Sequence, residues 1–256
     1  MDTEMEMQEI ISLVKETKAL VENRERAGHV KVKGRADYVT QVDTDIQNFL
    51  ARELGNRFPA IQFLGEEEGL HEMSGDTYWI LDPIDGTTNL IHDYQHSVVS
   101  LALYEKGGIT LGIVYDPFRE DVYHAQKGEG SFLNGTPIHV SDAETLSETI
   151  VTVGTSPYDR EVADENFKRI RRVFDHAQDI RRTGTAALDL AYVACGRIGG
   201  FFEPKLSPWD FAAGQLLVKE AGGMVTDFAG EELNFLKRGS VAASNGRIHE
   251  ELRGLL

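Results

Sequence analysis

The sequence predicts an α/β fold in two parts, with a mixed sheet and paired helices in the first half and an α/β second half. Three observations lead to this expectation. Apolar residues recur at helical spacing up to about Leu54, short apolar or alternating runs follow as far as Leu133, and strand and helix patterns alternate after Val140. We therefore expect an N-terminal half over residues 1–140 and a C-terminal half over residues 141–256.

Two helices are expected before the first strand. Apolar residues at helical spacing within 7–26 predict one amphipathic helix. The segment 28–38 is basic and rich in turn formers, so we expect a loop there. Thr40 and Asp43 have the spacing of a capping box, which predicts that a second helix begins here and extends to about Leu54.

Strand signals fill the rest of the first half. Gly107-Gly108 and Asn134-Gly135 mark tight turns between short strands. The expected strands are 61–64, 78–81, 99–103, 109–115, 122–125 and 131–133. In the second half we expect strands at 149–153 and 198–203 and helices at 166–174, 185–194 and 209–221, the last ended by Gly222-Gly223.

The chain is strongly acidic. Its 42 acidic and 26 basic side chains give a formal net charge of −16. This charge repels phosphate backbones and anionic lipids, which disfavours a nucleic-acid polymer or a membrane surface as a partner. A small phosphorylated substrate would be repelled as well, unless the acids gather around divalent cations that invert the local sign of the charge.

The expected location is the cytoplasm. No apolar run approaches the roughly 20 residues that cross a bilayer. The first residues are acidic where a secretory signal would be basic, and the single cysteine, Cys195, cannot form an internal disulfide.

The most informative segment is Trp79–Asn89, in a chain without P-loop, dinucleotide-fingerprint, zincin or serine-hydrolase motifs. An apolar strand delivers Asp82, Pro83 is expected to force a turn, and Asp85 follows. Both carboxylates and the Ile84 carbonyl can then face one point, and such a cluster of hard oxygens suits Mg²⁺. The alternative is a simple Asx turn at the end of a strand.

Two further acidic segments strengthen the metal hypothesis. The run Glu66-Glu67-Glu68 comes directly after an expected strand, and Asp210 lies at the start of an expected helix. The ordinary alternatives are a solvated loop for the glutamates and a helix N-cap for Asp210.

Together these segments resemble the inositol monophosphatase family, within the Mg²⁺-dependent, lithium-sensitive phosphatase superfamily. The resemblance covers nearly the whole chain, and it implies a layered α-β-α-β-α sugar-phosphatase fold and a homodimer. The segments that carry it are the paired N-terminal helices, Gly65-Glu66-Glu67, Asp82–Asn89, Gly184-Thr185-Ala186-Ala187 and Trp209–Gly214.

The resemblance implies two or three bound Mg²⁺ ions, with most ligands in the N-terminal half. Glu66, Asp82 and the Ile84 carbonyl would bind one ion. Asp82, Asp85 and Asp210 would bind a second, and Glu66 would also touch a third.

The resemblance also implies the catalytic groups. Thr87 would orient the attacking water, and Asp43 would hydrogen-bond Thr87. The alternative for Asp43 is an ordinary acid on a helix surface, and Glu66 is the alternative group for activating the water. The backbone N–H groups of Gly86 and Thr87 would hold phosphate.

Substrate contacts are implied for the second half of the chain and for two of the metal ligands. Glu203 matches an acid that hydrogen-bonds ring hydroxyls, and its alternative is a strand-end acid that faces water. The full implied set is Asp85, Gly86, Thr87, Gly184, Thr185, Ala186, Glu203 and Asp210. The chain departs from animal inositol phosphatases at Leu206-Ser207-Pro208, and no role is assigned to Lys31, Lys33, Arg35, Arg181 or Arg182.

The implied activity is Mg²⁺-dependent hydrolysis of a small phosphate monoester by metal-activated water, with inositol-1-phosphate as the expected substrate. The alternatives are a fructose-1,6-bisphosphatase, a nucleotide 3′-phosphatase or an NADP phosphatase of the same superfamily. A further alternative is a non-catalytic protein that binds metal or sugar phosphate. Thr87 and Asp43 argue against it, because a binding protein would not need a water-activating pair.

Overall fold

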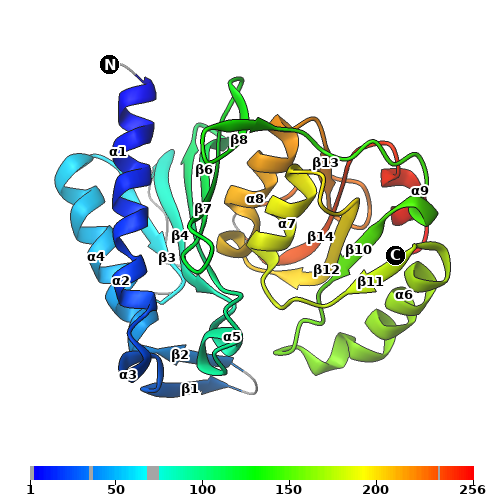
Figure 1. Cartoon of the computed structure of the whole chain (residues 1–256), viewed down its shortest axis with the longest axis horizontal. Coiled ribbons are helices and arrows are strands. Elements are labelled where there is room, and N and C mark those ends of the chain that lie inside the picture. Colours follow the sequence, from blue (N-terminus) through cyan, green and yellow to red (C-terminus); the bar gives the residue numbers. More distant parts are fainter. Residues whose placement is uncertain (1–2, 35–36, 68–74, 236) are drawn as a thin grey trace.

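The fold consists of two large β-sheets with helices between them and on both outer faces (Figure 1). The computed structural model describes residues 3–34, 37–67, 75–235 and 237–256. From left to right, Figure 1 shows helices α1 and α4, the sheet that contains β3–β8, helices α7 and α8, the sheet that contains β10–β14, and helices α6 and α9. The expected layered α-β-α-β-α arrangement is confirmed.

The expected first helix is divided into α1 (Thr3–Glu16), α2 (Lys18–Val21) and α3 (Arg24–Ala27). The first break lies at Thr17, whose hydroxyl donates to the Val14 carbonyl at 2.6 Å. Such back-bonding competes with the regular helical ladder. The prediction of one continuous helix was therefore wrong.

The prediction of a loop over residues 28–38 was also wrong. Strands β1 (Val30–Gly34) and β2 (Asp37–Thr40) pair there as an antiparallel hairpin, so a small sheet precedes the second long helix. Its sequence, Val30-Lys31-Val32-Lys33-Gly34, does alternate apolar and polar residues, but the alternation is short and all of β1 is solvent-exposed.

Helix α4 (Gln41–Arg57) begins at the expected capping box. The Thr40 hydroxyl accepts from the Val42 N–H at 3.2 Å, and the Asp43 carboxylate accepts from the Thr40 N–H at 2.9 Å. The buried residues of α4 pack with α1 against the outer face of the first large sheet.

The first large sheet has seven strands in the order β3-β4-β5-β6-β7-β8-β9. Only β3 and β4 are parallel among its described pairs. Lys106 and Gly107 form the β5–β6 turn, with φ of 49° and 97°, so this turn comes one residue earlier than expected. The strands are β3 (Gln62–Gly65), β4 (Thr77–Asp85), β5 (Val98–Glu105), β6 (Gly108–Asp116), β7 (Asp121–Gln126), β8 (Gly130–Leu133) and β9 (Thr136–Ile138).

Pro83 does not end β4, contrary to expectation. The strand continues to Asp85, and the pairing with β5 shifts register between Asp82 and Asp85. Such an irregularity accommodates a proline, which cannot donate to the ladder. Helix α5 (Thr87–Ile91) follows after Gly86.

The second large sheet has five strands in the order β11-β10-β12-β14-β13. Strand β10 is parallel to both of its neighbours, whereas β14 is antiparallel to β12 and β13. The strands are β10 (Ile150–Val153), β11 (Asp179–Arg181), β12 (Gly200–Leu206), β13 (Met224–Thr226) and β14 (Gly239–Ser244). The helices of this half are η1 (Leu146–Glu148), η2 (Arg160–Val162), α6 (Ala163–His176), α7 (Ala186–Ala194), α8 (Pro208–Glu220) and α9 (His249–Arg253).

Helices α7 and α8 fill the space between the sheets. A Cβ atom on Gly112 of β6 would lie 2.8 Å from the Ala213 carbonyl oxygen of α8, so the glycine allows close contact between strand and helix. Gly214 performs the same function between the two helices, where an added Cβ would lie 2.5 Å from Leu190.

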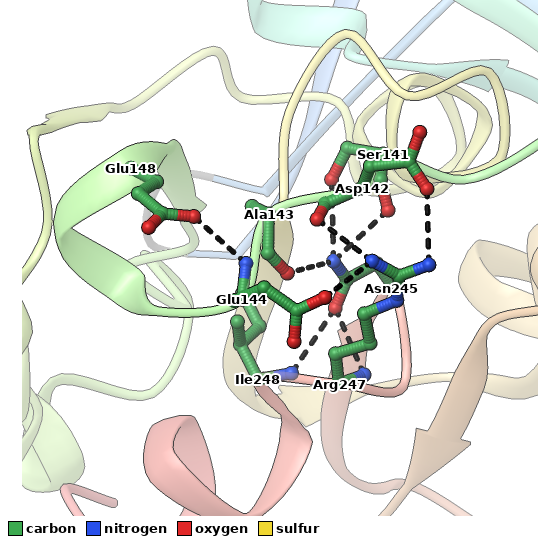
Figure 2. A network of polar contacts seen from close by, with 8 residues as sticks. All are labelled: Ser141, Asp142, Ala143, Glu144, Glu148, Asn245, Arg247 and Ile248. Atoms are coloured by element: carbon green, nitrogen blue, oxygen red, sulfur yellow. Dashed lines mark hydrogen bonds and ion pairs between the residues drawn. The ribbon is translucent and has the colours of Figure 1, made fainter.

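Asn245 and Arg247 connect the chain after β14 to the segment 141–144 (Figure 2). The Asn245 amide donates to the carbonyls of Ser141 and Ala143, and its carbonyl accepts from the N–H groups of Arg247 and Ile248. We call these contacts the Asn245 clasp. Within the described residues, no helix is long and apolar enough to span a membrane.

Candidate functional site

The candidate site lies where β3 and β4 end and where α5 and α8 begin. Because β3 and β4 are parallel neighbours, Glu66, which follows β3, lies beside the carboxyl end of β4. The Glu66 N–H donates to the Leu81 carbonyl at 3.1 Å. Asp82 and Asp85 lie on β4, and Asp210 lies in the first turn of α8. Segments far apart in the sequence thus bring four acids together.

Backbone hydrogen bonds orient the three aspartates. One oxygen of Asp82 accepts from the Ile84 N–H at 3.0 Å. One oxygen of Asp85 accepts from the Ala187 N–H at 2.6 Å, at the start of α7. Asp210 is the third residue of a capping box and accepts from the Ser207 N–H at 2.7 Å. Each carboxylate is therefore fixed by a different element.

Burial raises the pKa of all four carboxyl groups. The pKa of Glu66 rises to about 8 and that of Asp210 to about 7, in both cases chiefly through loss of solvation. The pKa values of Asp82 and Asp85 lie well above their usual range through burial and repulsion from neighbouring carboxylates. Asp82 is only 2% exposed. Bound cations would relieve this unfavourable concentration of negative charge.

The four carboxylates and Ile84 line one cavity of about 300 Å³, which we call the acidic cavity. In the described part of the chain, no three Asp, Glu, His or Cys side chains are already placed as ligands of one ion. The pairing of β3 with β4 and the start of α8 set the backbone positions of these residues, so their side chains share one cavity. The Lys33 ammonium lies 3.7 Å from Glu66 and 2.8 Å from Glu67.

Thr87 and Asp43 form a hydrogen-bonded pair beside the acidic cavity. The Thr87 hydroxyl lies 3.0 Å from the Asp43 carboxylate and 3.0 Å from the Ile84 carbonyl. The other Asp43 oxygen accepts from the Thr40 N–H and hydroxyl, at 2.9 Å and 2.5 Å. Asp43 is 0% exposed, so its interpretation as a helix-surface acid was wrong. Burial raises its pKa, although its hydrogen bonds oppose that effect.

Gly86 connects this region to the expected substrate loop. Its φ of 93° is left-handed, and an added Cβ would lie 2.7 Å from the Thr185 hydroxyl. The Asn89 amide donates to the carbonyls of His96 and Thr183, at 2.7 Å and 3.0 Å. Sequence reasoning gave Asn89 no role, yet its amide connects the segment Trp79–Asn89 to the loop before α7 that contains Gly184, which we call the Gly184 loop.

A larger cavity of about 490 Å³ adjoins the acidic cavity, and we call it the substrate cavity. Seven residues line both, namely Asp85, Gly86, Thr87, Tyr158, Glu203, Leu206 and Asp210. The expected residues Gly184, Thr185 and Ala186 also line the substrate cavity. The structure therefore brings together all the residues for which substrate contact was expected.

Glu203 is a buried residue of β12, so the interpretation as a strand-end acid facing water was wrong. It is 8% exposed, and one carboxylate oxygen accepts from the Ser156 N–H at 2.7 Å. A Cβ on Gly154 would lie 2.0 Å from the Glu203 carboxylate carbon. Burial raises the pKa of Glu203.

Sequence reasoning missed two further residues of the substrate cavity. Asp189 is buried on α7 and accepts from the Thr183 hydroxyl at 2.6 Å, whereas Tyr158 is largely exposed. The helical pattern placed Asp189 on α7, but nothing in it indicated a buried acid.

The basic residues have different surroundings. Arg182 lines the substrate cavity, whereas Arg181 pairs with Asp179. Lys31 is exposed on β1, and Lys33 approaches Glu66 of the acidic cavity, which Lys205 and Arg238 also line. Arg35 and Glu68 lie outside the described residues.

Comparison with known proteins assigns this arrangement to a family. A profile of the inositol monophosphatase family matches residues 3–256. The chain is 42% identical to the Nus factor SuhB of Escherichia coli K12 over 217 residues, which cover 84% of this chain and 81% of that protein. It is 40% identical to the inositol-1-monophosphatase of Rhizobium meliloti over 228 residues, which cover 89% and 85%.

Comparison with solved structures leads to the same family. The solved structure of an IMPase from Thermotoga maritima superimposes with a TM-score of 0.88 at 37% identity, covering 98% of this chain and 96% of that one. The chain thus belongs to the inositol monophosphatase family.

Proposed function

We propose that this protein hydrolyses a small phosphate monoester with the help of Mg²⁺, and that inositol-1-phosphate is its main substrate. The observation that carries the proposal is the acidic cavity lined by the carboxylates of Glu66, Asp82, Asp85 and Asp210, beside a hydrogen-bonded Thr87–Asp43 pair. Family membership and the inositol-1-monophosphatase relative support the same reaction class.

The donor set of the acidic cavity fits Mg²⁺, which prefers hard oxygen ligands. Glu66, Asp82 and the Ile84 carbonyl would hold one ion. Asp82, Asp85 and Asp210 would hold a second, and Glu66 would also touch a third. Bound Mg²⁺ would supply charge neutralisation for the phosphoryl oxygens and a lowered pKa for a water ligand.

The protein's own residues would orient the attacking water. The Asp43 carboxylate accepts the Thr87 hydroxyl hydrogen, so the Thr87 oxygen keeps a lone pair for a hydrogen of the water. Asp43 is itself held by two contacts to Thr40, which fix the direction of the pair. The backbone N–H groups of Gly86 and Thr87 would bind the phosphate, and Glu66 is the second candidate for accepting the proton of the water.

The substrate cavity would hold the rest of the molecule. Glu203 would accept hydrogen bonds from ring hydroxyls, because its other carboxylate oxygen is already held by Ser156. Gly184, Thr185 and Ala186 would contact the substrate at the start of α7, and Asp85 and Asp210 would contact it from the acidic cavity.

The test is phosphate release from a panel of inositol-1-phosphate, fructose-1,6-bisphosphate, a nucleotide 3′-phosphate and NADP. We expect the highest kcat/KM with inositol-1-phosphate. EDTA should abolish turnover, Mg²⁺ should restore it, and excess Ca²⁺ should inhibit because the larger ion takes more ligands. Li⁺ should inhibit submaximally. Turnover that survives EDTA would contradict the metal assignment, and a different preferred ester would correct the substrate.

A second candidate function is suggested by the relatives named Nus factor SuhB, at 42% identity. In that case the protein would act by binding a partner and not by catalysis, and the acidic cavity would hold metal without turning over a substrate. The same panel separates the two functions, since a binding protein would show Mg²⁺-dependent stabilisation but no phosphate release. Family membership also leads us to expect a homodimer, which light scattering would test.

A further inference from the structure

Arg182 is the positively charged residue of the substrate cavity. Among the described residues that line it, Arg182 is the only arginine or lysine, whereas Asp85, Asp189, Glu203 and Asp210 are acidic. Asp85, Glu203 and Asp210 also line the acidic cavity, but Arg182 does not. Its positive charge therefore belongs to the part of the substrate cavity that is not shared with the carboxylate cluster.

The surrounding loop positions the Arg182 side chain with little use of its hydrogen-bonding capacity. Nη2 donates to the Thr155 hydroxyl at 3.2 Å, which is its one side-chain hydrogen bond within the described structure. A Cβ on Gly184 would lie 2.3 Å from Nη1, so the guanidinium packs directly against this glycine. A guanidinium carries five N–H donors, so most of its donors are free to bind a ligand.

Arg181 provides a contrast one residue away. Its Nη1 atom pairs with Asp179 and donates to the Ile180 carbonyl at 2.7 Å, and Arg181 does not line the substrate cavity. Arg182 has no acidic partner within 4.0 Å among the residues that the structure describes. The two neighbouring arginines therefore differ in both location and pairing.

A neutral polyol beyond the phosphate would need hydrogen-bond acceptors such as Glu203, but it would gain little from an uncommitted guanidinium. A second anionic group would gain charge-assisted, geometrically matched hydrogen bonds from the same side chain. The simple alternative is that Arg182 only balances the charge of Glu203 and Asp189, which are both buried. That alternative does not explain its position on the cavity wall without a paired acid.

We propose that Arg182 is a specificity-determining residue that binds a second anionic group of the substrate, at the end away from the scissile phosphate. The substrate class thereby extends to phosphate monoesters with a second phosphate, such as sugar bisphosphates. This inference rests on the proposed phosphatase function and adds a ligand for one residue of its cavity.

The experiment compares fructose-1-phosphate with fructose-1,6-bisphosphate, which share the 1-phosphate and differ by the phosphate on O6. Because only the monophosphate can also close as a pyranose, each variant is compared with the wild type on the same ester. We expect Arg182→Gln to lower kcat/KM for the bisphosphate about 10–100-fold and that for the monophosphate less than about 3-fold. Arg182→Lys should retain part of the preference, because it keeps the charge but loses the planar donors. Arg181→Gln is the matched control and should leave both values at the wild-type level. An equal loss on both esters, or an unchanged ratio, would overturn the proposal.

A binding measurement distinguishes failure of this inference from failure of the proposed function. Calorimetric titration of both esters in the presence of Ca²⁺ reports affinity without requiring turnover. Tighter binding of the bisphosphate by the wild type, lost in Arg182→Gln and retained in Arg181→Gln, would support the anion-binding role even if no ester were hydrolysed. Equal affinity of wild type and Arg182→Gln for the bisphosphate would refute that role, even in an active phosphatase.

Discussion

The acidic cavity and the Asn245 clasp arrange polar groups in opposite ways. In the clasp, each donor meets an acceptor, and Asn245 alone makes contacts of 2.7–3.1 Å with four backbone groups (Figure 2). The acidic cavity instead brings carboxylates together, and burial raises the pKa of Glu66, Asp82, Asp85 and Asp210. The clasp is a feature that stabilises the fold, whereas the acidic cavity reduces stability until a cation binds.

The largest expected effect is that of Asp82→Asn on turnover. Asp82 is proposed to bridge two ions, so its neutralisation should lower kcat by more than about 10³-fold. The fold should remain intact, because the amide oxygen can still accept from the Ile84 N–H. Without metal, the variant should melt at or above the temperature of the wild type, since one buried charge has been removed. Most of the activity persisting at saturating Mg²⁺ would contradict the two-ion assignment.

Thr87→Ala should lower kcat by about 10²–10⁴-fold, equivalent to about 3–5 kcal/mol, while Mg²⁺ affinity changes far less. Asp43→Asn should have a similar effect, because it disturbs the hydrogen bond that fixes the Thr87 hydroxyl. The double variant should be scarcely worse than either single one. The measurement is a double-mutant cycle on kcat with Mg²⁺ titrated for each variant. Multiplicative losses would show that the two residues act independently.

Asn245→Ala should affect stability and leave catalysis unchanged. The substitution removes four hydrogen bonds to backbone groups and a longer one to the Ser141 hydroxyl, at a residue that is 4% exposed, so we expect a loss of about 2–4 kcal/mol in the free energy of unfolding. Arg247→Ala is the matched control, because its ion pairs with Asp142 and Glu144 are exposed and should contribute less than about 1 kcal/mol. Denaturant unfolding measures both. A fall in kcat of Asn245→Ala at saturating Mg²⁺ would show that the two regions are coupled.

The pH dependence of stability should distinguish the acidic cavity from the rest of the chain. In the absence of metal, the pKa of Glu66 is about 8 and that of Asp210 about 7, above the values of unfolded chains. The folded state then binds more protons than the unfolded state between about pH 5 and these folded pKa values, so stability falls across that interval by about 1.4 kcal/mol per pH unit for each proton and levels off above it.

Mg²⁺ competes with those protons, so the increase in melting temperature on adding Mg²⁺ should grow between about pH 6 and pH 8. Thermal melts with and without Mg²⁺ measure this increase. In Asp82→Asn, the Mg²⁺-induced increase in melting temperature should vary less with pH. A pH-independent Mg²⁺ effect would indicate that the ions bind away from these carboxylates.

Local signals in the sequence predicted much of the fold and named residues that the structure places along the two cavities. The capping box at Thr40 and the apolar run before Asp82 are short-range features, and both elements formed as expected. The hairpin over 30–40 was missed because the alternation Val30-Lys31-Val32-Lys33 is short and lies in a basic segment with several turn formers, which favoured a loop.

The burial of Glu203 was missed for a different reason. The carboxylate is enclosed by the chain around Gly154 and Ser156, which lies far from it in the sequence, and burial of this kind leaves no local pattern. Asp82 and Asp85 could be placed together from the sequence because both lie on one continuous segment, β4. The role of Asn89 depended on the distant Gly184 loop and could not be inferred from that segment alone.

The close packing of α8 against β6 determines how far Asp210 lies from the other carboxylates of the acidic cavity. Asp210 lies one helical turn before Ala213, the residue that Gly112 allows to approach the sheet. The Ser100 hydroxyl donates to the Trp209 carbonyl at 3.2 Å and fixes the same turn to β5. The position of Asp210 relative to the carboxylates of β4 is thus set by contacts of α8 with β5 and β6 that lie outside the carboxylate cluster. A shift of α8 relative to β6 would change the distance between Asp210 and the carboxylates of β4, even in a chain that remained folded.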